Sequence, residues 1–161
     1  MPRPVYILCV QSSSEDRESN LLSLFGLVEN FQITPIPAPL PNQPVFVLWQ
    51  PIRAVGAWLA EADDGPADEY ESELRVFIPG IEAPFVVATG VFRFRDPLPA
   101  RPLHRFVVNF PTPLPLAQPG TMCIEHRIRR KGTEEWLSQD YPVIVEQVQP
   151  PTDPPAQNQP A

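Results

Sequence analysis

Alternating apolar and polar positions along most of the chain predict β-strands. Side chains of a strand point alternately to its two sides, so a half-buried strand alternates apolar and polar residues. The window 71–78 follows this rule, with Leu74 and Val76 on one side and Glu73 and Arg75 on the other. Further windows show the same alternation or a short apolar run typical of strands: 6–10, 45–49, 85–95, 103–110 and 121–130.

Prolines separate these windows. The chain has 24 prolines in 161 residues, and proline lacks the backbone N–H that helices and sheet ladders use, so long helices are not expected. Most of the prolines fall in four clusters, which we expect to be loops or extended rim segments: 35–44, 97–102, 111–119 and 150–160. Residues 149–161 contain no large apolar side chain, and we expect them to form a disordered tail.

A tight hairpin is predicted at Lys131-Gly132, because glycine supplies the positive φ that such turns need. The returning strand is expected to reach Trp136 or Leu137 and to restart at Val143, after Pro142.

Counting the windows gives seven or eight strands, with turn signals between them and no alternation of strands with helices. The predicted fold class is therefore all-β: a single antiparallel β-sandwich with proline-rich loops, spanning residues 1–148.

Two stretches fit both a helix and a strand. In residues 12–25, Ser12 to Glu15 resembles a helix capping box, yet the segment 24–33 reads as extended, and the extended interpretation is favoured. In residues 52–62, the apolar residues match helical spacing after Pro51, but they also fit a continuation of the strand that begins at Val45.

Composition excludes some classes of function. Nineteen acidic and twelve basic residues give a net charge of −7, which disfavours binding to nucleic acid. The apolar run Val5 to Val10 is too short for a signal sequence or a membrane span. We therefore expect a cytoplasmic protein with no nucleic-acid or membrane partner.

The residues that catalysis or metal binding would need are few. Cys9 and Cys123 have neither disulfide-framework nor metal-site spacing. His126 shares a strand side with apolar residues, which indicates a partly buried, hydrogen-bonded imidazole, whereas Cys123 falls on the opposite side; His104 lies at a strand start. No nucleophile-elbow, zinc-protease, phosphate-loop or dinucleotide motif is present. We predict no catalytic, cofactor-binding or metal-binding residues, no cofactor, and no enzymatic activity.

Two charged segments remain. Residues 61–73 hold seven acidic residues and no basic one, which indicates a solvated loop that keeps a sheet edge from pairing; calcium binding is the alternative, although the spacing differs from an EF-hand loop. The second segment is basic, and with a nearby tryptophan it forms what we call the predicted partner face: Arg127, Arg129, Arg130, Lys131 and Trp136. Such a face can bind an acidic partner or phosphate, or can simply be solvated.

The N-terminal motif Tyr6-Ile7-Leu8-Cys9, a polar stretch over 11–19 and the segment Asn20 to Val28 resemble a bacterial family of small, uncharacterised β-sandwich domains. Members open with a strand ending in Leu-Cys, a polar loop and an Asn-Leu-x-x-x-Gly strand. The chain departs from the family at Val10, where an acidic residue is common. The resemblance implies the fold, but it implies no activity and no ligand residues.

The functional hypothesis from sequence is a non-catalytic protein-binding or assembly module, which meets an unknown protein partner or a second copy through a sheet edge. One alternative is a hydrolase that uses Cys9 or Cys123 with a histidine, which requires a histidine within hydrogen-bond reach of the thiol. Another is a calcium-dependent or membrane-surface sandwich domain.

Overall fold

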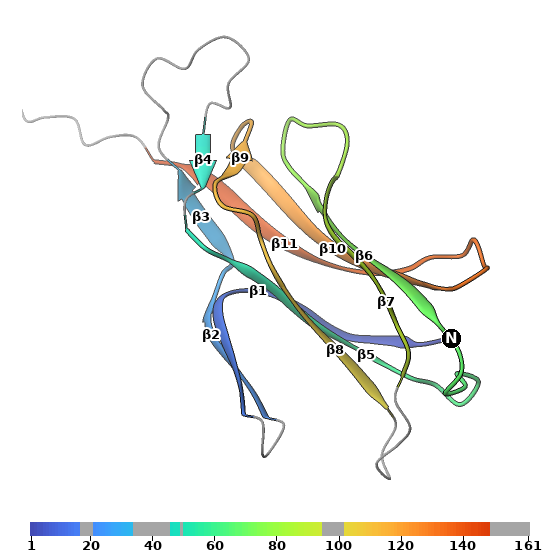
Figure 1. Cartoon of the computed structure of the whole chain (residues 1–161). Helices are drawn as coiled ribbons and strands as arrows, with labels where there is room; N and C mark the ends of the chain where they lie inside the picture. Colours follow the sequence, from blue (N-terminus) through green and yellow to red (C-terminus); the bar gives the residue numbers. More distant parts are fainter. Residues whose placement is uncertain (17–20, 34–45, 49, 95–101, 149–161) are drawn as a thin grey trace, which may run out of the picture.

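A computed structural model describes residues 1–16, 21–33, 46–48, 50–94 and 102–148 (Figure 1). These residues form eleven strands and no helix, so the all-β prediction is confirmed. In chain order the strands are β1 (Arg3–Asp16), β2 (Leu21–Leu27), β3 (Asn30–Ile33), β4 (Phe46–Leu48), β5 (Arg53–Leu59), β6 (Tyr70–Phe77), β7 (Phe85–Phe92), β8 (Leu103–Asn109), β9 (Leu114–Leu116), β10 (Gly120–Arg130) and β11 (Leu137–Gln147).

The strands make three sheets. A four-stranded sheet has the order β2-β1-β5-β8, a five-stranded sheet has the order β3-β11-β10-β6-β7, and β4 pairs with β9. All described neighbours are antiparallel except β3 and β11, which run parallel. The prediction of a purely antiparallel fold is therefore wrong at this edge. The chain leaves the four-stranded sheet at β2 and crosses to β11, where β3 lies in the same direction as its neighbour.

The described strands outnumber the seven or eight expected, because three of them are too short to show an alternating pattern. Strands β3, β4 and β9 have four, three and three residues. The expected extended segment 24–33 is divided between two sheets, since β2 ends at Leu27 and β3 begins at Asn30. A short strand carries too few side chains for its period to be recognised in sequence.

The two stretches that also fitted a helix are extended. Strand β1 continues to Asp16 and β2 follows from Leu21. Strand β5 was ambiguous in sequence because its residues Ala54 to Trp58 are all buried, so both sides of the strand are apolar and the period of two is lost.

One apolar core joins the two larger sheets. The four-stranded sheet contributes Ile7 and Trp58, and the five-stranded sheet contributes Leu74, Val76 and Ile124, all in a single buried cluster. The side of β6 expected to be apolar is thus the side that packs. Burying a large apolar side chain contributes roughly 1.5–3 kcal/mol, so this cluster is the main source of stability.

The hairpin prediction is confirmed in part. Strands β10 and β11 pair antiparallel, and Lys131-Gly132 forms a turn in which Gly132 has a φ of 86°. The expected tight connection is wrong, because the last paired residues are Ile128 and Leu137 and the returning strand begins only at Leu137. The expected break at Pro142 is wrong, because β11 runs without interruption from Leu137 to Gln147. Pro142 lies opposite Cys123 of β10, whereas β3 pairs only with the part of β11 that starts at Ile144. Among the described residues, no strand pairs with β11 at Pro142 on the side away from β10, so the missing N–H of Pro142 leaves no neighbouring strand without a donor there.

Part of the proline pattern can be compared with the structure. The cluster 111–119 includes β9, so it is an extended rim segment as expected, with Pro115 opposite Val47 of β4. Residues 35–44, most of 97–102 and the expected tail 149–161 lie outside the described residues.

Candidate functional site

The outer side of the β10–β11 hairpin brings together three residues of the predicted partner face. The guanidinium carbon of Arg127 lies 4.1 Å from the ring centroid of Trp136, and that of Arg129 lies 4.6 Å from the same centroid. Trp136 is half-buried, so it belongs neither to the core nor to a fully exposed patch. Both contacts have the geometry of cation–π interactions, which fix the indole against the sheet.

The arginines of this face are already paired with acidic residues of β6. Register places Arg127 opposite Glu73 and Arg129 opposite Glu71, and each pair has an N–O distance of 2.6 Å. A further pair lies along the same two strands with the charges exchanged. We call the three pairs the charge ladder: Arg129–Glu71, Arg127–Glu73 and Arg75–Glu125.

The ladder corrects the interpretation of the acidic segment 61–73. Its last residues, Tyr70 to Glu73, belong to β6, which lies between β10 and β7 and is not an edge. The acidic and basic segments, treated as separate features in sequence, are each other's partners. The sequence contained a signal for this pairing, because Glu71 and Glu73 are spaced two residues apart, as Arg127 and Arg129 are.

The other two cations of the predicted partner face turn towards the loop between β5 and β6. Lys131 Nζ lies 2.7 Å from Glu69, and Arg130 lies 3.2 Å from both Asp64 and Asp68. Hydrogen bonds from Lys131 and, to a smaller extent, from Arg93 hold the pKa of Glu69 below its usual value. The face is therefore charged but locally neutralised, and the described residues contain no group of three or more side chains arranged to hold a metal ion.

Tyr70 joins this loop to the core. Its hydroxyl donates a hydrogen bond to Asp64 Oδ1 at 2.6 Å, and its ring stacks on Phe92 with centroids 5.6 Å apart. Burial, reinforced by Asp64, raises the pKa of Tyr70 to about 12. The acidic loop is therefore anchored by a buried ring as well as by ion pairs.

Strand β7 is an edge of the five-stranded sheet. In the described part of the chain it pairs with β6 and has no strand on its other side (Figure 1). Its sequence has no charge and no proline, and Phe85, Val86 and Val91 keep 47%, 49% and 61% of their surface exposed. Edge strands are usually protected from pairing by charges, proline or short length. β7 has none of these three protections, although its register against β6 shifts once, between Val86 and Ala88.

Strands β7 and β8 are outer strands of the two larger sheets and lie on the same side of the molecule (Figure 1). The residues of the two strands line a cleft. Its volume is about 230 Å³. Its walls are mostly apolar and include both histidines of the chain, and the lining residues used below are Ser72, Ala88, Gly90, Phe92, His104, Phe106 and His126.

Both histidines are held neutral by their surroundings. His126 is 3% exposed, its Nδ1 accepts a hydrogen bond from Trp58 Nε1 at 2.8 Å, and its ring stacks on Phe106 at 3.8 Å. His104 stacks on Phe92 with centroids 3.6 Å apart. Burial lowers the pKa of His126 to about 3 and that of His104 to about 4. The hydrogen bond predicted for the imidazole at position 126 is present at Nδ1, and the ring is more deeply buried than expected.

The cysteines lie in unlike environments. Cys9 is completely buried, and burial raises the pKa of its thiol to about 12. Cys123 is half-buried on the opposite side of β10 from His126, as predicted, and burial followed by nearby acidic groups raises its pKa. Within the described ranges both thiols are free, and no hydrogen bond joins a cysteine to a histidine.

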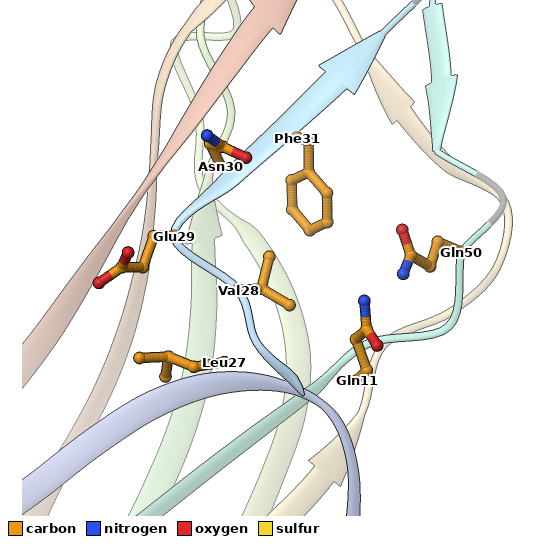
Figure 2. Close-up of a pocket in the computed structure, with 7 residues that line it drawn as sticks. All are labelled: Gln11, Leu27, Val28, Glu29, Asn30, Phe31 and Gln50. Atoms are coloured by element: carbon orange, nitrogen blue, oxygen red, sulfur yellow. The ribbon is translucent and has the colours of Figure 1, made fainter. Parts of the chain in front are cut away.

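A polar hollow of about 260 Å³ lies where β2 leads into β3. Figure 2 shows the amides of Gln11 and Gln50 pointing towards the space beside Phe31. Glu29 is the one ionisable residue among those that line it. Amide groups bind by hydrogen bonding but transfer no proton, so Glu29 is the one group in this lining with acid–base chemistry.

No protein-family model matches this chain, and no curated protein sequence matches it significantly. The resemblance to the bacterial β-sandwich family therefore stays a prediction. The described ranges hold no helix with the length and apolar character needed to cross a membrane.

Proposed function

We propose that the chain forms a β-sandwich domain and acts as a non-catalytic assembly module, in which β7 of one copy pairs with β7 of a second copy. Support for the sandwich comes from the two larger sheets, which share one core. Support for the assembly comes from the β7 edge, which is uncharged, free of proline and apolar at its exposed positions, and this is the observation that carries the proposal. Strand β2 shares these properties but is one residue shorter, so it serves as the comparison in the experiment below.

A second copy suits this edge for reasons of length and charge. β7 has eight residues, and its stretch from Ala88 to Phe92, which pairs with β6 without a register shift, is long enough for several backbone hydrogen bonds to a second copy. Because the strand is uncharged, two copies meet antiparallel about a two-fold axis without like charges opposite each other. On the neighbouring strand, Glu71 and Glu73 are neutralised by the charge ladder, which reduces the repulsion between two chains of net charge −7.

The predicted partner face is a weaker candidate than the β7 edge. Each of its four cations is already ion-paired within the chain, so an acidic partner would have to displace an existing carboxylate. Trp136 in turn is covered by the two arginines that stack on it.

The alternatives from sequence gain no support from the described residues. A cysteine–histidine hydrolase needs a histidine that activates a thiol, but His126 bonds to Trp58 and the pKa of Cys9 is raised. A calcium site needs converging unpaired oxygens, but Glu69, Glu71 and Glu73 bind basic side chains.

The experiment is sedimentation velocity over a hundredfold range of protein concentration. We expect wild type to form dimers, and the double variant Val86→Lys, Val91→Lys to weaken dimerisation at least tenfold, because four lysines meet across the two-fold axis. The matched control is Leu21→Lys, at a 65% exposed position on the other uncharged edge strand, β2, and it should dimerise as wild type does.

Two results would contradict the proposal. A wild-type chain that stays monomeric throughout, with β7 amides that exchange as rapidly as those of other edge strands, removes the assembly function. Dimers that persist in the β7 variant but are lost in Leu21→Lys assign the interface to β2.

A further inference from the structure

The cleft between β7 and β8 exists because the inward-facing residues of β7 are small. Ala88 and Gly90 lie opposite Leu74 and Ser72 of β6 and present almost no side chain to the space between the sheets. A Cβ atom added at Gly90 would lie 3.3 Å from Ser72 Oγ, so even one more carbon would crowd this wall. The aromatic residues of β8 stand on the other side, which leaves a gap of about 230 Å³.

His126 supplies a single polar group to this apolar space. The indole N–H of Trp58 is a donor only, so Nδ1 of His126 accepts and the proton of the neutral ring is on Nε2. Nε2 has no hydrogen-bond partner among the described residues. In the described part of the chain, Arg130 Nε is the one side-chain nitrogen that is both fully enclosed and without a hydrogen-bond partner. Because Nε2 of His126 also has no partner, it is not fully enclosed. The cleft is the described cavity that His126 lines.

An unpaired donor of this kind is unusual in a residue that is 97% buried, since buried polar groups are nearly always hydrogen-bonded. Trp58 is itself held in place: with its amide oriented to satisfy both neighbours, Gln139 accepts from Trp58 Nε1 at 3.2 Å and donates to the Tyr6 carbonyl at 3.0 Å. The imidazole is therefore held at Nδ1, which leaves Nε2 as the free donor of a residue that lines the cleft.

We propose that this cleft binds a small uncharged apolar molecule that carries one acceptor oxygen, such as a ketone or an ester, with the oxygen accepting from Nε2 of His126. The size is suitable, because a cavity of ~150 Å³ in another protein holds benzene, and this cleft has room for a substituted ring. The rings of Phe92 and Phe106 offer apolar surfaces to the body of the ligand.

An uncharged ligand fits better than an anion. An anion in this poorly solvated space would lack a compensating positive charge, because both histidines are stacked on phenylalanine rings and burial lowers the pKa of both. At neutral pH the cleft therefore offers a dipolar N–H and not a positive charge.

The test uses the whole chain and two probes of the same shape, acetophenone and ethylbenzene, of which only acetophenone has an acceptor oxygen. The measurement is NMR titration of the Nε2 resonance of His126 in protein labelled with ¹⁵N-histidine. We expect a saturable shift with acetophenone and an affinity for ethylbenzene about tenfold lower, as one net hydrogen bond predicts.

Two variants separate the cleft from the rest of β7. Ala88→Leu fills the cleft and should abolish the acetophenone shift, whereas Val86→Leu, at an exposed position on the same strand, should leave it unchanged. Equal affinity for the two probes in wild type would overturn the role of His126, and this result needs no variant to fold. The absence of a saturable shift, or unchanged binding by Ala88→Leu, would overturn the site. Neither result depends on whether β7 also forms dimers.

Discussion

The two sides of β10 show how one strand serves two different purposes. Its inner side carries Met122, Ile124 and Ile128, none of which has any measurable exposure. Its outer side carries Arg127 and Arg129, whose side chains stay partly solvated and pair with β6. Apolar burial contributes several kcal/mol per side chain, whereas partly exposed ion pairs contribute about 0–1 kcal/mol each. The inner side therefore provides the stability of the sheet.

The outer side of β10 helps to fix the register in which β10 pairs with β6. A slip of two residues keeps the apolar side buried, so burial alone does not forbid it. In one direction such a slip brings Arg127 opposite Arg75, and in the other it brings Glu125 opposite Glu73. Because the third pair of the charge ladder has its charges exchanged, each slip creates a like-charge pair, which is destabilising in a sheet. The ladder thus selects one pairing among those that the core would accept.

The largest effect is expected from the inner side. Ile124→Ala should lower the free energy of unfolding by about 2–5 kcal/mol, because it leaves a cavity in a fully buried site. Urea denaturation followed by circular dichroism measures this. The neighbouring outward substitution Cys123→Ala should cost less than about 1 kcal/mol, a typical value for a partly exposed site. Equal losses for the two variants would show that the two sides of β10 do not differ as described.

An intermediate effect is expected from pH. His104 and His126 have folded pKa values of about 4 and about 3, below the usual 6.5, so the unfolded chain binds more protons as the pH falls. The contribution of the two neutral histidines to the free energy of unfolding is therefore fully present above pH 6.5. It is lost as the pH falls from there towards 3, by at most about 1.4 kcal/mol per pH unit for each histidine.

Urea denaturation at several pH values between 6.5 and 5 checks this prediction. His104→Phe keeps an aromatic ring beside Phe92 and removes one titrating group, so its stability should depend on pH about half as steeply as that of wild type. A stability that is independent of pH in this range would contradict the burial of both imidazoles.

The smallest effect is expected from the ladder. Arg127→Glu should lower the free energy of unfolding by about 1 kcal/mol, because it places a second carboxylate opposite that of Glu73. Exchanging the pair, with Glu73→Arg and Arg127→Glu together, should restore most of the loss. Arg3→Glu, at an exposed pair away from the ladder, is the control and should change stability by only a few tenths of a kcal/mol. If the exchanged pair is no more stable than Arg127→Glu alone, the ladder does not act as a set of pairs.

The sequence was informative where burial alternates locally and uninformative where partners are distant. Windows such as 71–78 and 121–130 were recognised because one side of each strand is buried, and the turn at Gly132 because glycine marks a positive φ. The buried side of His126 followed from the same period. Its partner Trp58 did not, because it lies 68 positions away, in a strand that is apolar on both sides.

The candidate sites were harder to predict than the strands for the same reason. Three residues of the predicted partner face, Arg127, Arg129 and Trp136, lie together in the structure. The pairing of the two arginines with β6 was not predicted, because strand neighbours cannot be read from periodicity. The β7–β8 cleft arises where two different sheets end, and no single window contains both walls. The small inward-facing residues Ala88 and Gly90 are the one feature of the cleft that a single window of sequence contains.

The parallel pairing of β3 with β11 joins two segments that lie far apart in the sequence. Asn30–Ile33 lie beside Ile144–Gln147, more than a hundred residues later in the chain. On a ribosome that adds 5–20 residues per second, β3 leaves the exit tunnel roughly ten seconds before its neighbour exists. During that interval the phenylalanine and isoleucine of β3 lack the neighbouring strand that pairs with them in the folded chain.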